Sequence, residues 1–148
     1  MLAINIGDLE LTQSGFDSDP GMRVDANWPI HSGTGAAGST IVYFEVPAGK
    51  TCPPHSHTVE ESVLIVEGTA EVEIEGETET FSAGGIVVIP ALSRQVVRNV
   101  GDTVLRVVGF FPSTTVITTF DEILTPTSDR VVIVPEPDEV VEAYPHSR

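Results

Sequence analysis

The chain has 148 residues, and its 7 basic and 22 acidic side chains give a formal net charge of −15. This charge excludes a nucleic-acid binder or an anionic-membrane binder, because both need a basic face and Lys50 is the only lysine. The hydrophobic fraction of 41% is enough for one domain with a core. The expected partners are small neutral or cationic molecules, or metal ions.

No apolar run approaches the ~20 residues that span a bilayer, and the amino terminus lacks the features of a signal peptide. Cys52 is the only cysteine, which excludes an intrachain disulfide and a thiolate zinc cluster. A cytoplasmic protein is therefore expected. We interpret Cys52 as a small buried hydrophobic residue rather than a redox or ligand residue.

Residues 1–37 are expected to form a strand and loop arm at the start of a single domain that spans residues 1–148. Alternation of Leu2, Ile4 and Ile6 predicts an edge strand, and the Gly, Ser and Asp-rich stretch after it predicts a loop. His31 lies in this loop, where a surface position is expected and a lid over a barrel mouth is the alternative.

Residues 38–112 alternate short β-rich runs with turn residues, which predicts an antiparallel sandwich or barrel. In residues 70–81, glutamates occupy every second position opposite Ala70, Val72 and Ile74, and Glu75-Gly76-Glu77 predicts a hairpin turn. We interpret the glutamate row as a solvated outer face rather than a cation-binding strip.

Residues 113–148 are expected to add a strand or arm and a tail. Two runs in this segment, TTVITTF and VVIV, have β-strand composition. Asp138 to Ala143 follow a proline and could make one helical turn.

Three metal-capable side chains, His55, His57 and Glu61, lie close together in the sequence and share parity. A straight strand would separate His55 from Glu61 by about 20 Å, so the chain must bend near residues 58–60. Two imidazoles and one carboxylate hold a divalent first-row metal and leave positions open. The alternative is a metal-free barrel whose histidines bond to the backbone. Glu60, of opposite parity, is expected in solvent.

Residues 49–99 resemble the two motifs of the cupin superfamily. The first motif is glycine, five residues, His-x-His, three residues, glutamate, six residues and glycine, and it is matched in full. The second is matched at its first glycine, its proline and its asparagine. The matching residues are Gly49, His55, His57, Glu61 and Gly68 in the first motif, and Gly84, Pro90 and Asn99 in the second. Leu92 stands where glycine is usual, and Gln95 where the fourth metal ligand, a histidine, is usual.

This resemblance implies an all-β fold, a single-domain cupin jelly-roll barrel, also called a double-stranded β-helix. It also implies one divalent metal ion held by His55, His57 and Glu61. Gln95 would complete the ligand set through its amide oxygen or orient a bound water. Some cupin isomerases resemble this chain in using a glutamine ligand.

An apolar pocket is expected around the ion, lined from inward strand positions by Phe44, Val63, Ile65 and Val97. Arg94 and Arg98 are expected to face outward, so a carboxylate or phosphate clamp is not predicted. Such a pocket suits a small, mostly uncharged organic molecule.

Leu64 and Val66 add apolar side chains to the outer face of their strand. A strand that is apolar on both faces is buried on both, so a homodimer is expected. Small cupins that resemble this chain commonly form dimers.

The leading hypothesis is a metalloenzyme that acts on a small, mostly apolar organic molecule, with Glu61 as the catalytic residue that moves a proton. A dioxygenase-like reaction would use Fe, Mn or Ni. An isomerase-, lyase- or cyclase-like reaction would also accept Zn. The alternative is a non-catalytic small-molecule-binding or sensor cupin.

Overall fold

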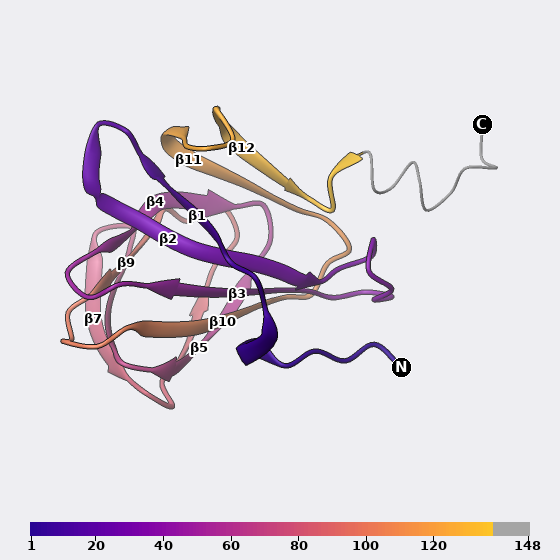
Figure 1. Ribbon diagram of the computed structural model, residues 1–148, viewed down its shortest axis with the longest axis horizontal. Coiled ribbons are helices and arrows are strands. Elements are labelled where there is room, and N and C mark those ends of the chain that lie inside the picture. Colours follow the sequence, from indigo (N-terminus) through magenta and orange to yellow (C-terminus); the bar gives the residue numbers. More distant parts are fainter. Residues whose placement is uncertain (138–148) are drawn as a thin grey trace.

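The computed structural model describes residues 1–137, which form an all-β jelly-roll barrel of two sheets with the core between them (Figure 1). One sheet has the order β1-β2-β3-β10-β5-β8, and the other has the order β7-β6-β9-β4-β11-β12. The strands of the first sheet are β1 (Thr12–Phe16), β2 (Asp19–Ile30), β3 (Thr40–Val46), β5 (Glu61–Glu67), β8 (Ile86–Ile89) and β10 (Leu105–Phe111). Those of the second are β4 (Thr51–His57), β6 (Thr69–Ile74), β7 (Glu77–Ser82), β9 (Gln95–Asn99), β11 (Val116–Leu124) and β12 (Asp129–Val134).

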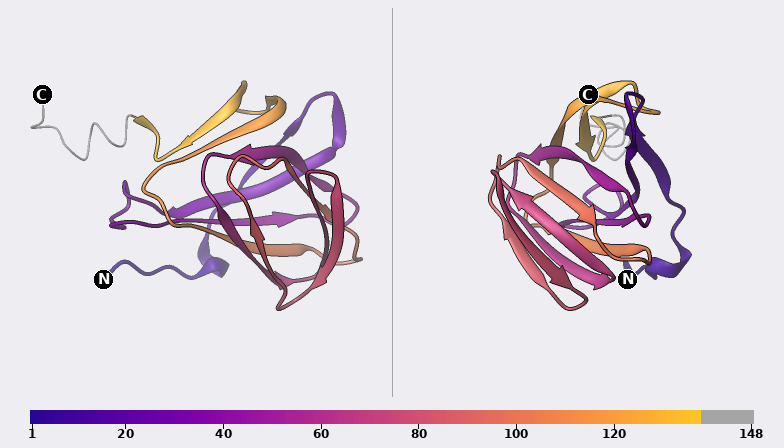
Figure 2. Two further views of the ribbon diagram at one scale, coloured as in Figure 1. Left: turned by 180° about the vertical axis from the view of Figure 1, so that it is seen from behind. Right: turned by 90° about the vertical axis from the view of Figure 1, so that its left-hand side faces the viewer.

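All strand pairs within each sheet are antiparallel, and a parallel contact between β2 and β4, Met22 beside Thr51, joins the two sheets. Figure 2 shows the strands curling around a common interior, with the β11–β12 hairpin lying across one side. The predicted all-β jelly-roll fold is confirmed. None of the helices among residues 1–137 has the length and apolarity that a membrane crossing requires.

Period-two alternation explains how β10 builds the interior. Leu105, Val107 and Phe111 are fully buried on one face, while Arg106 and Phe110 lie on the other. Strands β3 and β5 flank β10 in antiparallel register and place their own valines and isoleucines beside the same buried face. The core is therefore a continuous apolar layer between the two sheets.

The β6–β7 hairpin confirms the predicted turn. Glu75 and Gly76 both have positive φ, 49° and 86°, which is the conformation of a two-residue type I′ turn. Ala70 and Val72 are buried as expected. Glu71 and Glu73 lie on the opposite face, where Arg98 contacts them at 3.0 and 2.9 Å. The expected single row of glutamates is wrong beyond the turn, because Glu77 and Glu79 pair with Ile74 and Val72 and project to the same side as those apolar residues.

The amino-terminal segment differs from the expected strand and loop. Residues 1–5 form no strand, a 3-10 helix, η1 (Ile6–Asp8), follows them, and β1 and β2 occupy the stretch expected as a loop. The sequence pattern did not predict strand β2, because the small Ala26 weakens the apolar series on its inward face. Short polar residues also lie between its apolar residues. The loop expectation holds after β2, where residues 31–38 form turns and bends.

The carboxyl-terminal segment contains the two expected strands, β11 and β12, which pair in an antiparallel hairpin. Strand β11 also pairs with β4, so this hairpin belongs to the second sheet. The predicted helical turn over Asp138 to Ala143 lies outside the described residues.

Candidate functional site

The site lies where β4 ends and β5 begins. His55 and His57 are inward residues of β4, and Glu61 is the first residue of β5 after a turn at residues 58–60, as the reach argument predicted. Gln95 opens β9 and is the register partner of His55. These four residues are 2–7% exposed, so the barrel buries all of them.

The polar atoms of the four side chains converge. His55 Nε2 lies 3.1 Å from His57 Nε2, and His57 Nε2 lies 3.3 Å from Glu61 Oε1. The Gln95 side-chain amide donates a hydrogen bond of 3.1 Å to the same Glu61 oxygen. Residues that are up to 40 positions apart in the chain therefore form one buried polar cluster.

The backbone sets the tautomer of His55. Its Nδ1 lies 2.7 Å from the carbonyl oxygen of Pro53, and because a carbonyl only accepts, Nδ1 carries the proton. Burial and the neighbouring His57 lower the pKa of His55 from 6.5 to about 4. At neutral pH the ring is therefore uncharged, and Nε2 presents a lone pair to the cluster.

His57 is held from the opposite side by Thr118, whose Oγ1 lies 2.7 Å from Nδ1. In this arrangement His57 Nε2 faces two acceptors, His55 Nε2 and Glu61 Oε1, so the proton is on Nε2 and the Thr118 hydroxyl donates to Nδ1. A hydroxyl both donates and accepts, so Thr118 can bond to either tautomer of His57.

Glu61 carries a negative charge inside the barrel. Burial by itself raises the pKa of this carboxyl, but the hydrogen bonds from His57 and Gln95 and the two imidazoles outweigh it, and the pKa is lowered. The buried cluster thus combines a carboxylate with the uncharged imidazole of His55.

Gly109 makes room for that carboxylate. A Cβ at this position of β10 would collide with Glu61 Oε2 and come within 2.8 Å of Val42 Cγ1. Only a residue without a side chain fits between β10 and the Glu61 head group. The site therefore requires glycine at position 109, because the Glu61 carboxylate occupies the space that a side chain would fill.

Aromatic side chains surround the imidazoles. The Trp28 ring stacks on Phe111 with centroids 5.7 Å apart and meets His57 edge-on at 6.5 Å. The Phe120 ring lies 5.1 Å from His55. This packing restrains both imidazole rings and keeps the cluster in an apolar environment.

In the observed conformation the cluster is closed by its own hydrogen bonds. Among residues 1–137, no group of three or more His, Cys, Asp or Glu side chains is arranged, as it stands, to hold a metal ion. The donor types are nevertheless those of a 2-His-1-carboxylate site, and the second ring nitrogen of each histidine is already occupied.

A cavity of about 340 Å³ opens onto the cluster. His55, His57, Glu61 and Gln95 lie in its wall, as does Phe44, which was expected there. The other lining residues come mainly from β1, β2, β11 and β12. They are Thr12, Ser14, Val24, Ala26, Asn27, Trp28, Val42, Cys52, Thr118, Phe120, Leu124, Thr127, Val132 and Glu136.

Three residues expected in the pocket, Val63, Ile65 and Val97, lie in the hydrophobic core and not in the cavity wall. Each is at most 1% exposed. They do point inward, but the cavity lies nearer to β1, β2 and the β11–β12 hairpin, so core packing covers these side chains.

The structure also places the other residues that the sequence singled out. Glu60 is exposed and Cys52 is buried, as expected, and burial raises the pKa of the Cys52 thiol. Arg94 faces outward in an ion pair of 2.8 Å with Asp121, and Arg98 pairs with the glutamate row. His31 is not a surface residue: it is 5% exposed, and its Nδ1 accepts a hydrogen bond from Gly33 N–H.

Sequence reasoning did not identify Thr118, Phe120, Trp28 or Gly109 as site residues. Thr118 and Phe120 reach the cluster because β11 pairs with β4 in a register that sets them beside His57 and His55. That register joins strands about sixty residues apart, and no local pattern encodes it. The only signal for Gly109 was a glycine inside a strand of mostly large apolar residues, which indicates close approach of another group.

Comparison with known proteins agrees with the fold. A family model described as "Cupin domain" matches residues 42–111. No curated protein matches the chain. One similar solved structure is named as a candidate sugar phosphate isomerase from Acidithiobacillus ferrooxidans, with 17% identity, a TM-score of 0.62 and coverage of 80% of each chain.

Two further solved structures share this fold. The polyketide cyclase RemF from Streptomyces resistomycificus has 22% identity and a TM-score of 0.61, over 76% of this chain and 79% of that one. Oxalate decarboxylase from Lactobacillus farciminis has 24% identity and a TM-score of 0.60, over 70% of this chain and 31% of that one. The matched segment 42–111 contains both motifs and forms most of the barrel, so these residues form a cupin domain.

Proposed function

We propose that this chain is a metal-dependent cupin enzyme of the cytoplasm that acts on a small, mostly apolar and uncharged organic molecule. The reaction is dioxygenase-like or isomerase-, lyase- or cyclase-like. The observation that carries the proposal is the buried cluster in the cavity wall, where two imidazole nitrogens and one carboxylate oxygen lie within 3.3 Å of their neighbours.

The donor set fits a divalent first-row metal. His55 offers the Nε2 lone pair at neutral pH, and Glu61 supplies a negative charge that needs compensation inside the barrel. His57 would offer its own Nε2 lone pair in the tautomer with the proton on Nδ1, and that N–H would then donate a hydrogen bond to Thr118 Oγ1. His55, His57 and Glu61 would therefore hold the ion, with Gln95 beside them.

Bound Fe, Mn or Ni would supply a Lewis acid with open coordination positions and access to oxygen chemistry, and Zn would serve the non-redox reactions. The protein's own residues do the rest. Glu61 holds or accepts a proton at its carboxylate, and Gln95 orients that carboxylate through the amide hydrogen bond of 3.1 Å. Trp28 and Phe120 restrict water around the cluster.

The charge of the cavity narrows the substrate class. Apart from the site histidines, the ionisable side chains in the described part of the wall are Cys52, Glu61 and Glu136, and neither lysine nor arginine is among them. A phosphate or a dicarboxylate would meet no cation from these residues. The oxalate and sugar phosphate in the names of two fold neighbours are therefore poor guides to this substrate.

A non-catalytic binding or sensor protein is the second candidate, and one observation favours it. Outside the cluster, the described cavity wall offers only Cys52 and Glu136 as acid or base groups, and burial raises the pKa of Cys52. Reactions that move two protons need a second positioned group. A binding protein needs none.

The first test is the metal content of protein purified without chelator, measured by elemental analysis. We expect about one equivalent of Fe, Mn, Ni or Zn in the parent, lost in His57→Ala and Glu61→Gln. Glu60→Gln is the matched control, because this neighbouring glutamate is exposed, and it should keep the metal.

Folded parent protein that takes up none of the four ions when they are offered would contradict a metalloenzyme. If metal binds, oxygen uptake and product formation with neutral enols, diketones and hydroxyaryl compounds separate the two candidates. Turnover that is lost in Glu61→Gln supports the enzyme. Saturable binding without turnover supports the sensor.

A further inference from the structure

We propose that Gln95 binds the substrate and not the metal. Its amide nitrogen holds the Glu61 carboxylate, and its amide oxygen accepts a hydrogen bond from a hydroxyl or N–H group of the molecule in the cavity. This role rests on the proposed function, because it concerns the same cavity. Gln95 is then a specificity-determining residue, and His55, His57 and Glu61 are the ligands.

The orientation of the Gln95 amide follows from its partner. A carboxylate only accepts hydrogen bonds, so the arm of the amide that lies 3.1 Å from Glu61 Oε1 is the nitrogen. The nitrogen and the oxygen of an amide lie on different arms of one planar group, so the oxygen faces elsewhere. To reach an ion held by Glu61, that oxygen would have to turn toward the carboxylate. Glu61, which is only 2% exposed, would then lose this donor.

The amide oxygen of Gln95 is left open to the cavity. In the described part of the chain, no group donates a hydrogen bond to this oxygen. It is not sealed in the core either, because every fully buried side-chain nitrogen or oxygen of residues 1–137 has a partner. Since Gln95 lies in the cavity wall, its oxygen is available to a molecule there. A free acceptor of this kind selects a molecule that carries an O–H or N–H donor.

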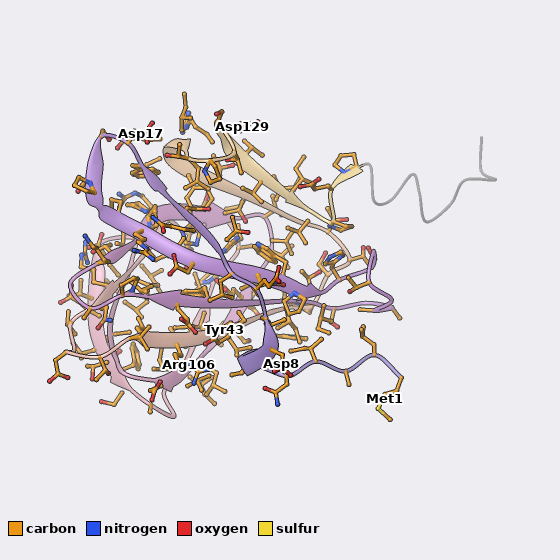
Figure 3. All side chains as sticks on the ribbon, in the orientation of Figure 1. Met1, Asp8, Asp17, Tyr43, Arg106 and Asp129 are labelled. Atoms are coloured by element: carbon orange, nitrogen blue, oxygen red, sulfur yellow. The ribbon has the colours of Figure 1, made fainter. Side chains whose placement is uncertain are left out.

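The charges around the cavity favour a neutral donor. Arg106 donates to the Tyr43 hydroxyl at 2.7 Å on the opposite face of β3 and β10, where Figure 3 shows the two side chains together. Neither lysine nor arginine occurs in the described part of the cavity wall, so an anion would meet the Glu61 carboxylate without compensation. A neutral hydroxyl donates to Gln95 and then lies beside the carboxylate that accepts a proton in the proposed function.

NMR of glutamine-labelled protein tests the orientation of the amide. The chain has only two glutamines, Gln13 and Gln95, and Gln13 is exposed, so it serves as the control within the same spectrum. Gln13→Leu and Gln95→Leu assign the two sets of signals. In the full chain without metal, the side-chain N–H protons of Gln95 should exchange with water at least about tenfold more slowly than those of Gln13, because Glu61 accepts one of them.

Addition of Zn(II) to the labelled parent tests ligation. The Gln95 N–H protons should stay protected, and the carbonyl carbon of the Gln95 side chain should keep its chemical shift. Ligation through the amide oxygen would move this carbon signal and end the protection, and that result would overturn the proposal.

Phenol and anisole test the open amide oxygen, because phenol carries a hydroxyl and the methyl ether of anisole cannot donate. Ligand-observed NMR with the parent should give at least about threefold tighter binding of phenol, and Gln95→Leu should lose this preference. Gln13→Leu makes the same change at an exposed position outside this cavity wall and should keep the preference.

Failure of this proposal differs from failure of the proposed function. A parent that takes up no metal contradicts the metalloenzyme, and the metal-free spectrum and the two probes then decide the role of Gln95. Equally fast exchange of both glutamine amides would overturn that role. So would a parent that binds anisole as tightly as phenol, a parent that binds neither, or a folded Gln95→Leu variant that keeps the preference for phenol. If Gln95→Leu does not fold, the spectra of the parent still distinguish the two orientations.

Discussion

Glu61 and Gly109 depend on each other across two strands. The carboxylate occupies the space that any side chain at position 109 would take, and Gln95 and His57 hold it there by hydrogen bonds. Glu61 is 2% exposed and lies in the cavity wall, so filling that space would push its carboxylate toward the cavity and away from Gln95 and His57. Gly109 of β10 therefore determines where the Glu61 carboxylate lies, and Glu61 is the only buried carboxylate of the site among the described residues.

We predict that Gly109→Ala destabilises the protein by about 1–3 kcal/mol, the usual cost of overpacking a core, and displaces Glu61. Chemical denaturation measures the first effect, and titration with Mn(II) or Zn(II) should show at least about tenfold weaker binding. Gly38→Ala is the matched control, because a Cβ at Gly38 would meet nothing within 4 Å.

A shorter acid should relieve the collision. In the double variant Glu61→Asp with Gly109→Ala, the carboxylate is shorter by one methylene and leaves room for the new Cβ. The free energy of unfolding that the double variant loses should therefore be smaller than the sum of the losses in the two single variants. Simple additivity of the two losses would show that Gly109 does not act through Glu61.

Local spacing was sufficient to identify the ligand-type residues of the site. Parity put His55, His57 and Glu61 on one face, and reach required the bend that the structure has at residues 58–60. Thr118 could not be found this way, because its contact with His57 depends on the register between β4 and β11. Val63 shows the same limit: parity gives the inward direction but does not distinguish core from cavity.

Strands in which apolar and polar residues alternate regularly could be predicted from the sequence. Strands in which this alternation is weak could not. The β6–β7 hairpin follows from its alternating glutamates and its Glu75-Gly76 turn, whereas β2 was hidden by Ala26 and by the polar residues between its inward positions. The turn of this hairpin requires a positive φ at position 76, where φ is 86°, and glycine is the residue that adopts this conformation most easily.

We expect Gly76→Ala to cost about 1 kcal/mol of unfolding free energy, because a Cβ is disfavoured at positive φ even where space is open. A Cβ at Gly76 would meet nothing within 4 Å, so backbone strain is the only cause to consider. Gly38→Ala, again in open space and without positive φ, should be neutral. Equal denaturation midpoints for the two variants would contradict the strain argument.

At the scale of the whole molecule, negative charge opposes the compact state. The chain carries 22 acidic against 7 basic residues, and several of the arginines are already in ion pairs with carboxylates. Repulsion among the remaining carboxylates acts over tens of ångströms at low salt, where the screening length is about 30 Å, and is largely screened at physiological ionic strength.

Thermal unfolding should therefore shift upward as NaCl is raised from low to physiological concentration. For a chain of this size, a gain of about 1 kcal/mol corresponds to a rise in Tm of roughly 2–4 °C. Glu77→Gln combined with Glu79→Gln removes two exposed charges from one strand and should reduce the response. A Tm that falls with salt would mean that the ion pairs outweigh the repulsion.

The pairing of β11 with β4 also has a consequence for biosynthesis. Thr118 and Phe120 reach His57 and His55 only after the segment following β10 has been made and docked. Until then the two imidazoles lack their partners, although the His-x-His segment is already exposed to cellular ions. The proposed metal site should therefore form late, only after β11 has been synthesised and has paired with β4, and the slow closure of such long-range strand pairs would control maturation.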